Sequence, residues 1–371
     1  MGWFGRKADA ADPRSAKPFY VSGGECDPLP RSYAARVTEV YVNNPVGQRA
    51  VRLVAGAAGG LPIYAVEGRD AAANLVRRAG LIEGIAAQLL LHGNAFVQVV
   101  VGSDGTPAEL FCLRPERVTV ETDARGWPSA YLYRVKSQVS RFPVRDALAR
   151  TQVVHIKALN PGDDHLGLGC LDAAIAAASV HNRATRWNKA LLDNAARPSG
   201  ALTFEPGDGS TLSEAQFTRL RSEMDESFSG SGNAGRPLLL EGGLKWQSLS
   251  LTPADMDFVG LKEAAARDVA LAFGVPPVLL GLPGDSTYAN LREAGRALYR
   301  QTVLPLAQRI VDGLGAGLSD WFGPLRLAID VDQISELAED RERLWQQVGA
   351  ATFLSDAEKR EMLGFKPEQG R

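Results

Sequence analysis

Apolar residues recur along the chain at two spacings, and these spacings separate helical segments from strands. Over residues 36–58 and 81–91 the apolar side chains fall mostly three or four positions apart, which predicts helices with one buried face. Longer helices are predicted over residues 170–196, 253–273 and 288–318, and two or three shorter ones over residues 332–364. Strands are predicted over residues 95–101, 109–113, 118–121, 130–135, 152–157, 201–204, 237–241 and 245–251. The sequence therefore predicts an α+β protein.

Turn residues mark where these elements end and which segments belong together. Gly93 stops the helix of residues 81–91, and a turn-rich loop over residues 159–169 precedes the first long helix. Thr252-Pro253-Ala254-Asp255 has the cap, proline and carboxylate of a helix start, and Pro305 is expected to kink the last long helix. The first two long helices, about 40 Å and 30 Å in length, therefore bracket a small α/β insertion of about 55 residues.

Composition and charge limit the classes of function. The 371 residues are 45% hydrophobic and 23% charged, with a net charge of -2 and a pI near 6.2. Proteins that grip DNA phosphates carry a basic excess, so this chain either avoids nucleic acid or handles it without gripping it. The four histidines and three cysteines are scattered, which predicts no metal site and reduced, structural thiols.

No segment has the pattern of a membrane span or a secretion signal. The most apolar stretch, residues 51–66, is interrupted by Arg52 and Pro62, and the residues after Met1 run straight into charge. We therefore expect a protein that is used in the cytoplasm or assembled into a particle there.

Motifs for catalysis are missing from the sequence. It contains no Walker A motif, which predicts that the chain does not hydrolyse ATP, and residues 229–233 lack the spacing of a nucleophile elbow. Asp163, Asp164 and His165 suggest a metal or acid–base site, but adjacent loop residues rarely converge on one point. We therefore favour a loop held by Asx turns there, and we expect neither enzymatic activity nor a cofactor.

Five motifs occur in a fixed order along the chain. They are residues 1–4 (MGWF), 89–96 (LLLHGNAF), 155–157 with 163–167 (HIK, DDHLG), 196–200 (ARPSG) and 273–281 (FGVPPVLLG). In this order they resemble the portal proteins of tailed phages, in particular the HK97-like family. The segment between the strand near Ile63 and the helix near Ile82 is shorter than is usual in that family, and the compact length resembles portals of gene transfer agents and prophage remnants.

The resemblance implies a portal fold with a wing, a stem of long helices, a small α/β clip, a tunnel loop and a C-terminal helical crown. Such subunits form a ring, usually of twelve, at one capsid vertex of the virion, and the ring is the channel for DNA packaging and ejection. The implied parts are an N-terminal arm (1–30), the wing (31–169), stem helices (170–196 and 253–275), the clip (197–252), the tunnel loop (276–288), a long wing helix (289–325) and the crown (326–371).

The same resemblance implies candidate residues on the DNA path. The tunnel loop facing DNA would contain Val278, Leu279, Leu280, Gly281, Leu282, Pro283, Gly284, Asp285, Ser286 and Thr287. Leu282 and its neighbours are expected to line the narrowest part of the channel. A basic stripe near the DNA would contain Arg292, Arg296 and Arg300, but charge stripes are usually solvated faces. We therefore favour pairing of these arginines with Glu293 or with the acids of a neighbouring subunit.

Further candidate residues are implied at the stem and the clip. Arg183, Arg186 and Lys189 are expected at the ring interface, where they would pair with Asp255, Asp257, Glu263 or Asp268. Contact with DNA is the second interpretation of this stripe. The clip surface toward partners would include Ser229, Gly230, Ser231, Asn233 and Trp246, although core packing is an equal alternative for Trp246 and for Trp187.

The implied partners are other copies of the chain, double-stranded DNA, the terminase large subunit, the major capsid protein and a head-tail adaptor, with no membrane. A weakly charged loop suits a wall past which DNA slides, because each phosphate gripped by Lys or Arg reduces mobility. One alternative is a head-tail adaptor or another capsid-associated subunit, which the order of helices argues against. Another is a Ser/His/Asp hydrolase, which no motif supports.

Overall fold

The computed structural model describes residues 29–68, 70–193, 200–204, 213–216, 218–219, 222, 244–248, 257–283 and 287–363. Its first half contains α1 (Tyr33–Val37), η1 (Thr38–Val42), α2 (Pro45–Gly59), β1 (Ile63–Glu67), α3 (Asp70–Val76), α4 (Leu81–His92), β2 (Asn94–Val101), β3 (Pro107–Leu113), η2 (Pro115–Arg117), β4 (Val118–Thr122), β5 (Pro128–Val135), β6 (Gln138–Pro143) and β7 (Val153–Lys157). Its second half contains α5 (Leu171–Asp193), β8 (Gly200–Phe204), β9 (Leu244–Ser248), α7 (Phe258–Ala272), η4 (Pro277–Leu280), α8 (Tyr288–Leu298), η5 (Tyr299–Val303), α9 (Leu304–Phe322), β10 (Arg326–Ile329), η6 (Val331–Gln333), η7 (Ser335–Leu337), α10 (Ala338–Ala350) and α11 (Asp356–Met362).

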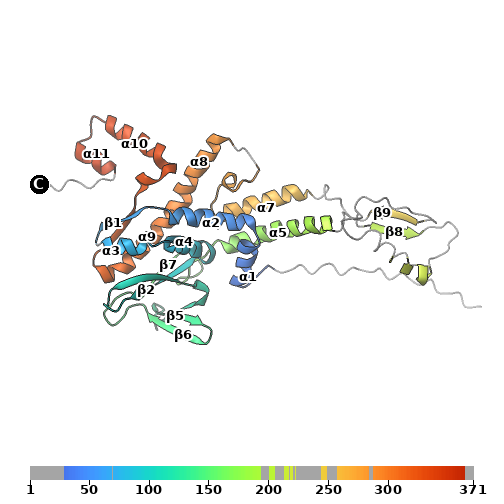
Figure 1. The fold of residues 1–371 in the computed structure, drawn as a ribbon, viewed down its shortest axis with the longest axis horizontal. Helices are drawn as coiled ribbons and strands as arrows, with labels where there is room; N and C mark the ends of the chain where they lie inside the picture. The colour runs from blue at the N-terminus through green and yellow to red at the C-terminus, as the bar shows by residue number, and fades with distance from the viewer. Residues whose placement is uncertain are drawn as a thin grey trace, which may run out of the picture.

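A three-stranded antiparallel sheet, ordered β3-β2-β7, organises the mixed lobe (Figure 1). Its central strand β2 is apolar at most positions because both of its faces are covered. Ala95 and Val97 belong to the main core, which also contains side chains of α2, α4 and α9. Phe96 points the other way and joins a second core with Tyr131 of the β4-β5-β6 sheet. The two cores together explain the long apolar run that β2 presents in the sequence.

Two helix glycines bring α9 directly onto the sheet. A Cβ atom at Gly313 would lie 2.8 Å from Ile156, and one at Gly317 would lie 2.3 Å from Val154, both on β7. Such distances are too short for any side chain, so only glycine permits this approach. The Gly-x-x-x-Gly spacing therefore sets how α9 covers β7.

The strand expected near Ile63 is present as β1, whereas the short strands β6 and β10 were not predicted. β1 pairs antiparallel with β10, so that Ile63 lies opposite Ile329, and β6 completes the β4-β5-β6 meander. Residues 326–329, which we assigned to the C-terminal helical segment, are therefore paired with a strand of the mixed lobe. The remainder of that segment forms α10 and α11, in agreement with the shorter helices predicted there.

The helices α5 and α7 run side by side away from the mixed lobe toward β8 and β9 (Figure 1). They contact each other through small side chains, because alanine favours helix and lets two helix axes approach closely. The buried alanines are Ala174, Ala178 and Ala184 of α5 and Ala265, Ala266 and Ala270 of α7. The long helix pair that the sequence predicted around the small insertion is thus present.

The predicted helix over residues 36–58 is interrupted at Asn44. Its side chain caps α2 by accepting hydrogen bonds from the backbone N–H groups of Val46 (3.0 Å) and Gly47 (2.9 Å). Pro45 occupies the first position of α2, where a missing N–H does no harm. The hydrophobic spacing continues across this break, so periodicity alone did not reveal it.

The start of the second long helix differs from the prediction. α7 begins at Phe258 with Asp257 as its cap rather than at Pro253, and residues 251–256 lie outside the described residues. The last long helix runs from α8 through the π-helical turn η5 into α9 with helical backbone at both junctions, and Pro305 lies in the first turn of α9. β9 pairs with β8, and the strand predicted over residues 237–241 lies outside the described residues.

We predict that Gly93→Ala destabilises the fold far more than Gly80→Ala. Both glycines have φ +82°, where any other residue costs roughly 1–2 kcal/mol, but only at Gly93 would a Cβ collide with backbone, 2.4 Å from the carbonyl carbon of Leu168. Nothing lies within 4 Å of a Cβ at Gly80. Thermal and urea unfolding should show a loss of more than about 3 kcal/mol for Gly93→Ala and of only about 1–2 kcal/mol for the control. Equal losses would mean that the close approach at Gly93 is not rigid.

Candidate functional site

The segment between α7 and α8 leaves the stem pair at Gly274, which has φ +65°. Thr302 Oγ1 of the π-helical turn η5 donates a hydrogen bond to the carbonyl oxygen of Gly274 (2.7 Å). Val275 is buried, and Arg267 Nη2 of α7 donates to the carbonyl oxygen of Pro283 (2.6 Å). The segment is therefore tied to η5 where it begins and to α7 near its far end.

The leucines of the predicted tunnel loop turn toward the protein. Leu279, Leu280 and Leu282 are half-buried and pack against the main core. The exposed described positions of the loop are Gly281, Pro283 and Thr287, while Gly284, Asp285 and Ser286 lie outside the described residues. The exposed surface of residues 276–288 thus comes from these residues and from Tyr288, which is 76% exposed, rather than from Leu282.

Acids of α8 and α10 pair with every arginine of the predicted basic stripe. The ion pairs are Arg292–Glu339 (2.6 Å), Arg296–Glu339 (2.8 Å), Arg296–Glu293 (3.2 Å), Arg296–Asp340 (3.5 Å) and Arg300–Asp340 (3.3 Å). The Arg296 side chain is only 10% exposed, whereas Arg292 and Arg300 are about half exposed or more. Glu293 was anticipated as a partner from its spacing, but Glu339 and Asp340 were not. The stripe joins α8 to the C-terminal helices.

Most of the charged residues of the predicted ring interface lie on α5 and α7. Arg186 lies 3.9 Å from Glu39, and Glu263 lies 3.6 Å from Arg267 on its own helix. Asp257 caps α7 by accepting a hydrogen bond from the N–H of Gly260 (3.2 Å). Arg183, Lys189 and Asp268 are exposed on the helix surfaces, and Asp255 lies outside the described residues.

Two apolar stripes remain exposed on the outer faces of the stem pair. They are Ala173, Ala176, Val180 and Trp187 on α5 and Leu261, Ala264 and Leu271 on α7. Leu271 is 76% exposed, and Trp187 stacks on Phe258 with a ring-centre distance of 5.9 Å. Exposed apolar positions in helical register are typical of a surface that another helix covers.

A buried amide joins two motifs that are far apart in the sequence. Asn94 Oδ1 accepts hydrogen bonds from the N–H of Gly167 (2.7 Å) and from His155 Nε2 (3.0 Å). Its Nδ2 donates to the carbonyl oxygen of Gly167 (2.9 Å) and contacts His92 Nδ1 (3.2 Å). The helix-to-strand junction and the loop before α5 therefore meet at one side chain, which the sequence did not predict.

The amide also fixes the protonation of both histidines. The Gly167 N–H and carbonyl fix which amide atom of Asn94 is the oxygen and which is the nitrogen. The oxygen can only accept, so His155 Nε2 must donate to it, and the nitrogen can only donate, so His92 Nδ1 must accept from it. Burial lowers the pKa of His155 to about 4, with further contributions from Lys157 and His92. Burial likewise lowers the pKa of His92. Both rings are thus neutral near pH 7.

A second amide holds the middle of α5. Asn44, besides capping α2, donates from Nδ2 to Asn182 Oδ1 (3.0 Å) and contacts His181 Nδ1 (3.3 Å). Asn182 in turn donates to the carbonyl oxygen of Glu39 (2.8 Å). Burial lowers the pKa of His181, so this ring is also neutral near pH 7. The first stem helix is therefore attached to the lobe at two separate polar contacts.

The loop over residues 159–169 is held by Asx turns, as favoured from the sequence. Asp163 Oδ1 accepts hydrogen bonds from the N–H groups of His165 (2.7 Å) and Leu166 (2.9 Å). These bonds lower the pKa of Asp163. The predicted clip residues Ser229, Gly230, Ser231 and Asn233 lie outside the described residues, as does the side chain of Trp246, whose backbone belongs to β9.

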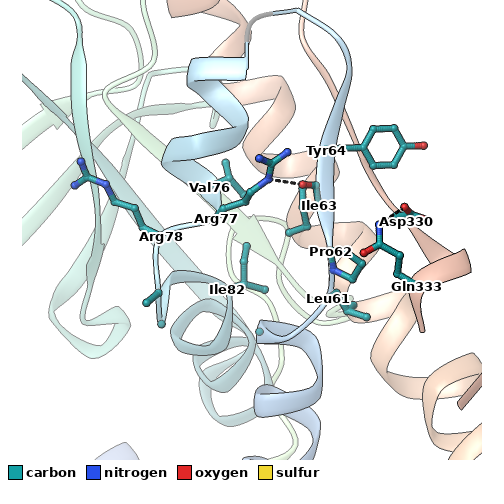
Figure 2. A pocket seen from close by; sticks show the side chains of 13 residues that line it. Leu61, Pro62, Ile63, Tyr64, Val76, Arg77, Arg78, Ile82, Asp330 and Gln333 are labelled. Carbon is teal, nitrogen blue, oxygen red and sulfur yellow. Dashed lines mark hydrogen bonds between the residues drawn. The ribbon is translucent and has the colours of Figure 1, made fainter. Parts of the chain in front are cut away.

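Figure 2 shows a pocket of about 350 Å³ between β1, the α3–α4 connection and the residues after β10. Arg77 Nε donates a hydrogen bond to the carbonyl oxygen of Ile63 (2.6 Å) at its rim, and Arg78 points away. The lining is mostly apolar and offers no paired acid and base. Within the described ranges, no three His, Cys, Asp or Glu residues are arranged to hold a metal ion, and no helix has the length and apolar character needed to cross a bilayer.

Similarity to known proteins extends over most of the chain. The family described as phage portal protein matches residues 45–364. An uncharacterized protein of Rickettsia felis is 39% identical over 89% of this chain and 88% of its own length, and the portal protein of Enterobacteria phage HK97 is 25% identical over 61% of this chain and 51% of its own. A chain from the neck of a native gene transfer agent particle, computed with C12 symmetry, is 44% identical with a TM-score of 0.70, covering 91% of this chain and 95% of that one.

Replacing Arg296 with leucine should destabilise the chain by about 3 kcal/mol, because three acids lose a buried partner that leucine cannot replace. Arg292→Leu is the matched control, since Arg292 shares Glu339 but its side chain is 48% exposed. Its loss should stay within about 1 kcal/mol. Urea unfolding of the two variants checks this difference, and similar midpoints would show that the burial of Arg296 is unimportant.

Acidification between pH 7 and pH 5 should weaken the fold through His155. Its pKa is about 4 in the folded chain and 6.5 when exposed, so the unfolded chain binds the proton first and stability falls as the pH drops below about 6.5. The full effect is on the order of 2–3 kcal/mol. His155→Gln keeps a side-chain N–H for Asn94 and removes the titration, so its melting temperature should depend less on pH in this range. An unchanged slope would contradict the prediction.

Proposed function

The chain belongs to the phage portal protein family and is a head-tail connector subunit, and from that premise we propose that copies of it close into a ring of twelve around a channel for DNA. The family is the one that the five sequence motifs indicated. Portal proteins are structural assemblies. The gene transfer agent neck with C12 symmetry supports twelve as the number of copies, because this chain shares 44% identity with its subunit.

Each part of the chain then has a place in the ring. Residues 31–169 and 289–325 form the wing, residues 170–196 and 253–275 form the stem, residues 197–252 form the clip, residues 276–288 form the tunnel loop, and residues 326–371 form the crown. Residues 1–30 precede the wing as an arm. The terminase large subunit and a head-tail adaptor would meet the clip in turn, and the major capsid protein would surround the ring at the virion vertex.

The stem carries the observation that most strongly supports a ring. α5 and α7 pack side by side and still expose one apolar stripe each, so the pair has two apolar faces that nothing in the described part of the chain covers. A ring needs two different surfaces that complement each other around an axis. The exposed Arg183 lies between Val180 and Trp187 in the register of the α5 stripe, and the exposed Asp268 lies between Ala264 and Leu271 in that of the α7 stripe. The outer face of α5 in one subunit therefore fits the outer face of α7 in the next.

The attachment of the tunnel loop to the core and its lack of charge are further arguments for the proposed channel. Its exposed described positions, Gly281, Pro283, Thr287 and Tyr288, are uncharged, and its leucines anchor it to the core. The arginines of α8 and η5, which follow it in the chain, are paired with acids of the same chain. DNA passing this wall would meet few cations able to hold a phosphate, which permits sliding.

We predict that Leu271→Asp abolishes rings while the chain still folds. A charge in the stem interface would be buried without a partner, whereas Leu271 in the lone subunit is exposed and tolerates it. Leu148→Asp is the matched control, because Leu148 is 71% exposed on a turn of the wing. Native mass spectrometry and negative-stain microscopy should show closed rings for the parent and Leu148→Asp but only small species for Leu271→Asp. Rings formed by both variants would show that the stem is not part of the subunit interface. A parent chain that forms no rings would contradict the proposed channel.

A further inference from the structure

A second cavity, of about 450 Å³, lies between η5 and the helix α10 of the C-terminal segment. Its lining combines an apolar floor with charged walls. The residues are Arg300, Leu304, Val331, Leu337, Asp340, Arg341, Arg343, Leu344 and Gln347. Leu304 and Val331 pack partly against the main core, so the floor is continuous with the folded interior.

The walls of this cavity are basic. Three arginines and one aspartate line it, an excess of two positive charges. Arg300 is paired with Asp340 (3.3 Å), and Arg341 is paired with Asp332. Arg343 is exposed and forms no ion pair with the described residues. The cavity therefore suits an apolar side chain that is accompanied by carboxylates.

The same subunit carries such a group in the turn between α10 and α11. Phe353 is 85% exposed, more than any other large apolar side chain of the described residues. It is followed by Asp356 and Glu358 in the first turn of α11. Ser355 and Glu358 form a capping box, with the Ser355 N–H donating to the Glu358 carboxylate (2.8 Å), and these bonds lower the pKa of Glu358. The aromatic ring and the two negative charges are thus presented on a fixed turn.

Phe353 does not fill the cavity of its own chain, since its ring is almost fully exposed. Each subunit consequently has one basic cavity that its own Phe353 does not fill. It also has one exposed turn that carries an aromatic ring and two carboxylates. This is the pattern of a contact in which one subunit inserts a group into the next, and such a contact closes when copies are arranged around an axis. Burying a phenylalanine in an apolar cavity is also among the larger gains available to an interface.

We propose that Phe353 of each subunit occupies the cavity between η5 and α10 of the neighbouring subunit, with Asp356 and Glu358 facing Arg343. The occupant is a second copy of this chain, so the inference rests on the ring proposed above. It adds a second contact between subunits, in the C-terminal helices, that is independent of the stem.

Disulfide trapping tests the contact directly. Phe353→Cys is combined with Leu344→Cys in a chain that also carries Cys26→Ser. The remaining thiols are half-buried, and burial raises the pKa of Cys112 to about 11 and also raises that of Cys170, so both react slowly with oxidant. Oxidised rings should give a ladder of covalent multimers on a non-reducing denaturing gel. Phe353→Cys with Gln347→Cys tests the exposed rim of the same cavity, in case the change at Leu344 harms folding.

Three controls separate this contact from random collision. Phe353→Cys alone and Leu344→Cys alone should remain monomeric on the gel, because neither has a partner thiol. Met362→Cys with Leu344→Cys places an exposed thiol elsewhere on α11 and should give at most one tenth of the multimers. Rings that yield no ladder with either Phe353→Cys pair overturn this contact and leave the ring intact. Failure of the parent chain to form rings overturns both proposals.

Discussion

The buried amide of Asn94 fixes where the first stem helix leaves the mixed lobe. Its oxygen accepts a hydrogen bond from the Gly167 N–H, and its nitrogen donates one to the Gly167 carbonyl oxygen. α5 begins only four residues later. Glycine at residues 93 and 167 removes the side chains that would keep the two backbones apart. Asn182 binds the same helix to the lobe about three turns further on, so both the origin and the direction of α5 are set.

The π-helical turn η5 likewise fixes the end of α7 and the start of the C-terminal helices. Thr302 of this turn donates to Gly274 at the end of α7, and Arg300 pairs with Asp340 at the start of α10. The stem, the segment after it and the C-terminal helices therefore meet within five residues of one irregular helix. π-helical turns are frequent at functional sites. Here the side chains of Arg300 and Thr302 in one such turn reach two different segments.

Long helices were predictable because their periodicity extends over many turns, as in residues 81–91 and in α5. The short strand β10 was not, since it holds four residues and gains its stability from pairing with β1 across most of the chain. The dipeptide Asn44-Pro45 is typical of a helix start, but the apolar spacing continues on both sides of it and indicated one uninterrupted helix. Among the site residues, Glu293 could be matched to Arg296 by helical spacing, whereas Glu339 lies 43 residues away and left no local signal.

The pairing of the α8 arginines bears on how a channel can work with a net charge of -2. An arginine that already has a carboxylate partner must release it before it can hold a phosphate, so its net gain from DNA is small. The acids that reduce the available charge lie on α10, outside the stem and the tunnel segment. The same ion pairs therefore hold the C-terminal helices onto α8 and, in the proposed ring, would keep the wall beside it weakly attractive to DNA. A surface built in this way would let DNA pass and leave the driving force to a separate motor.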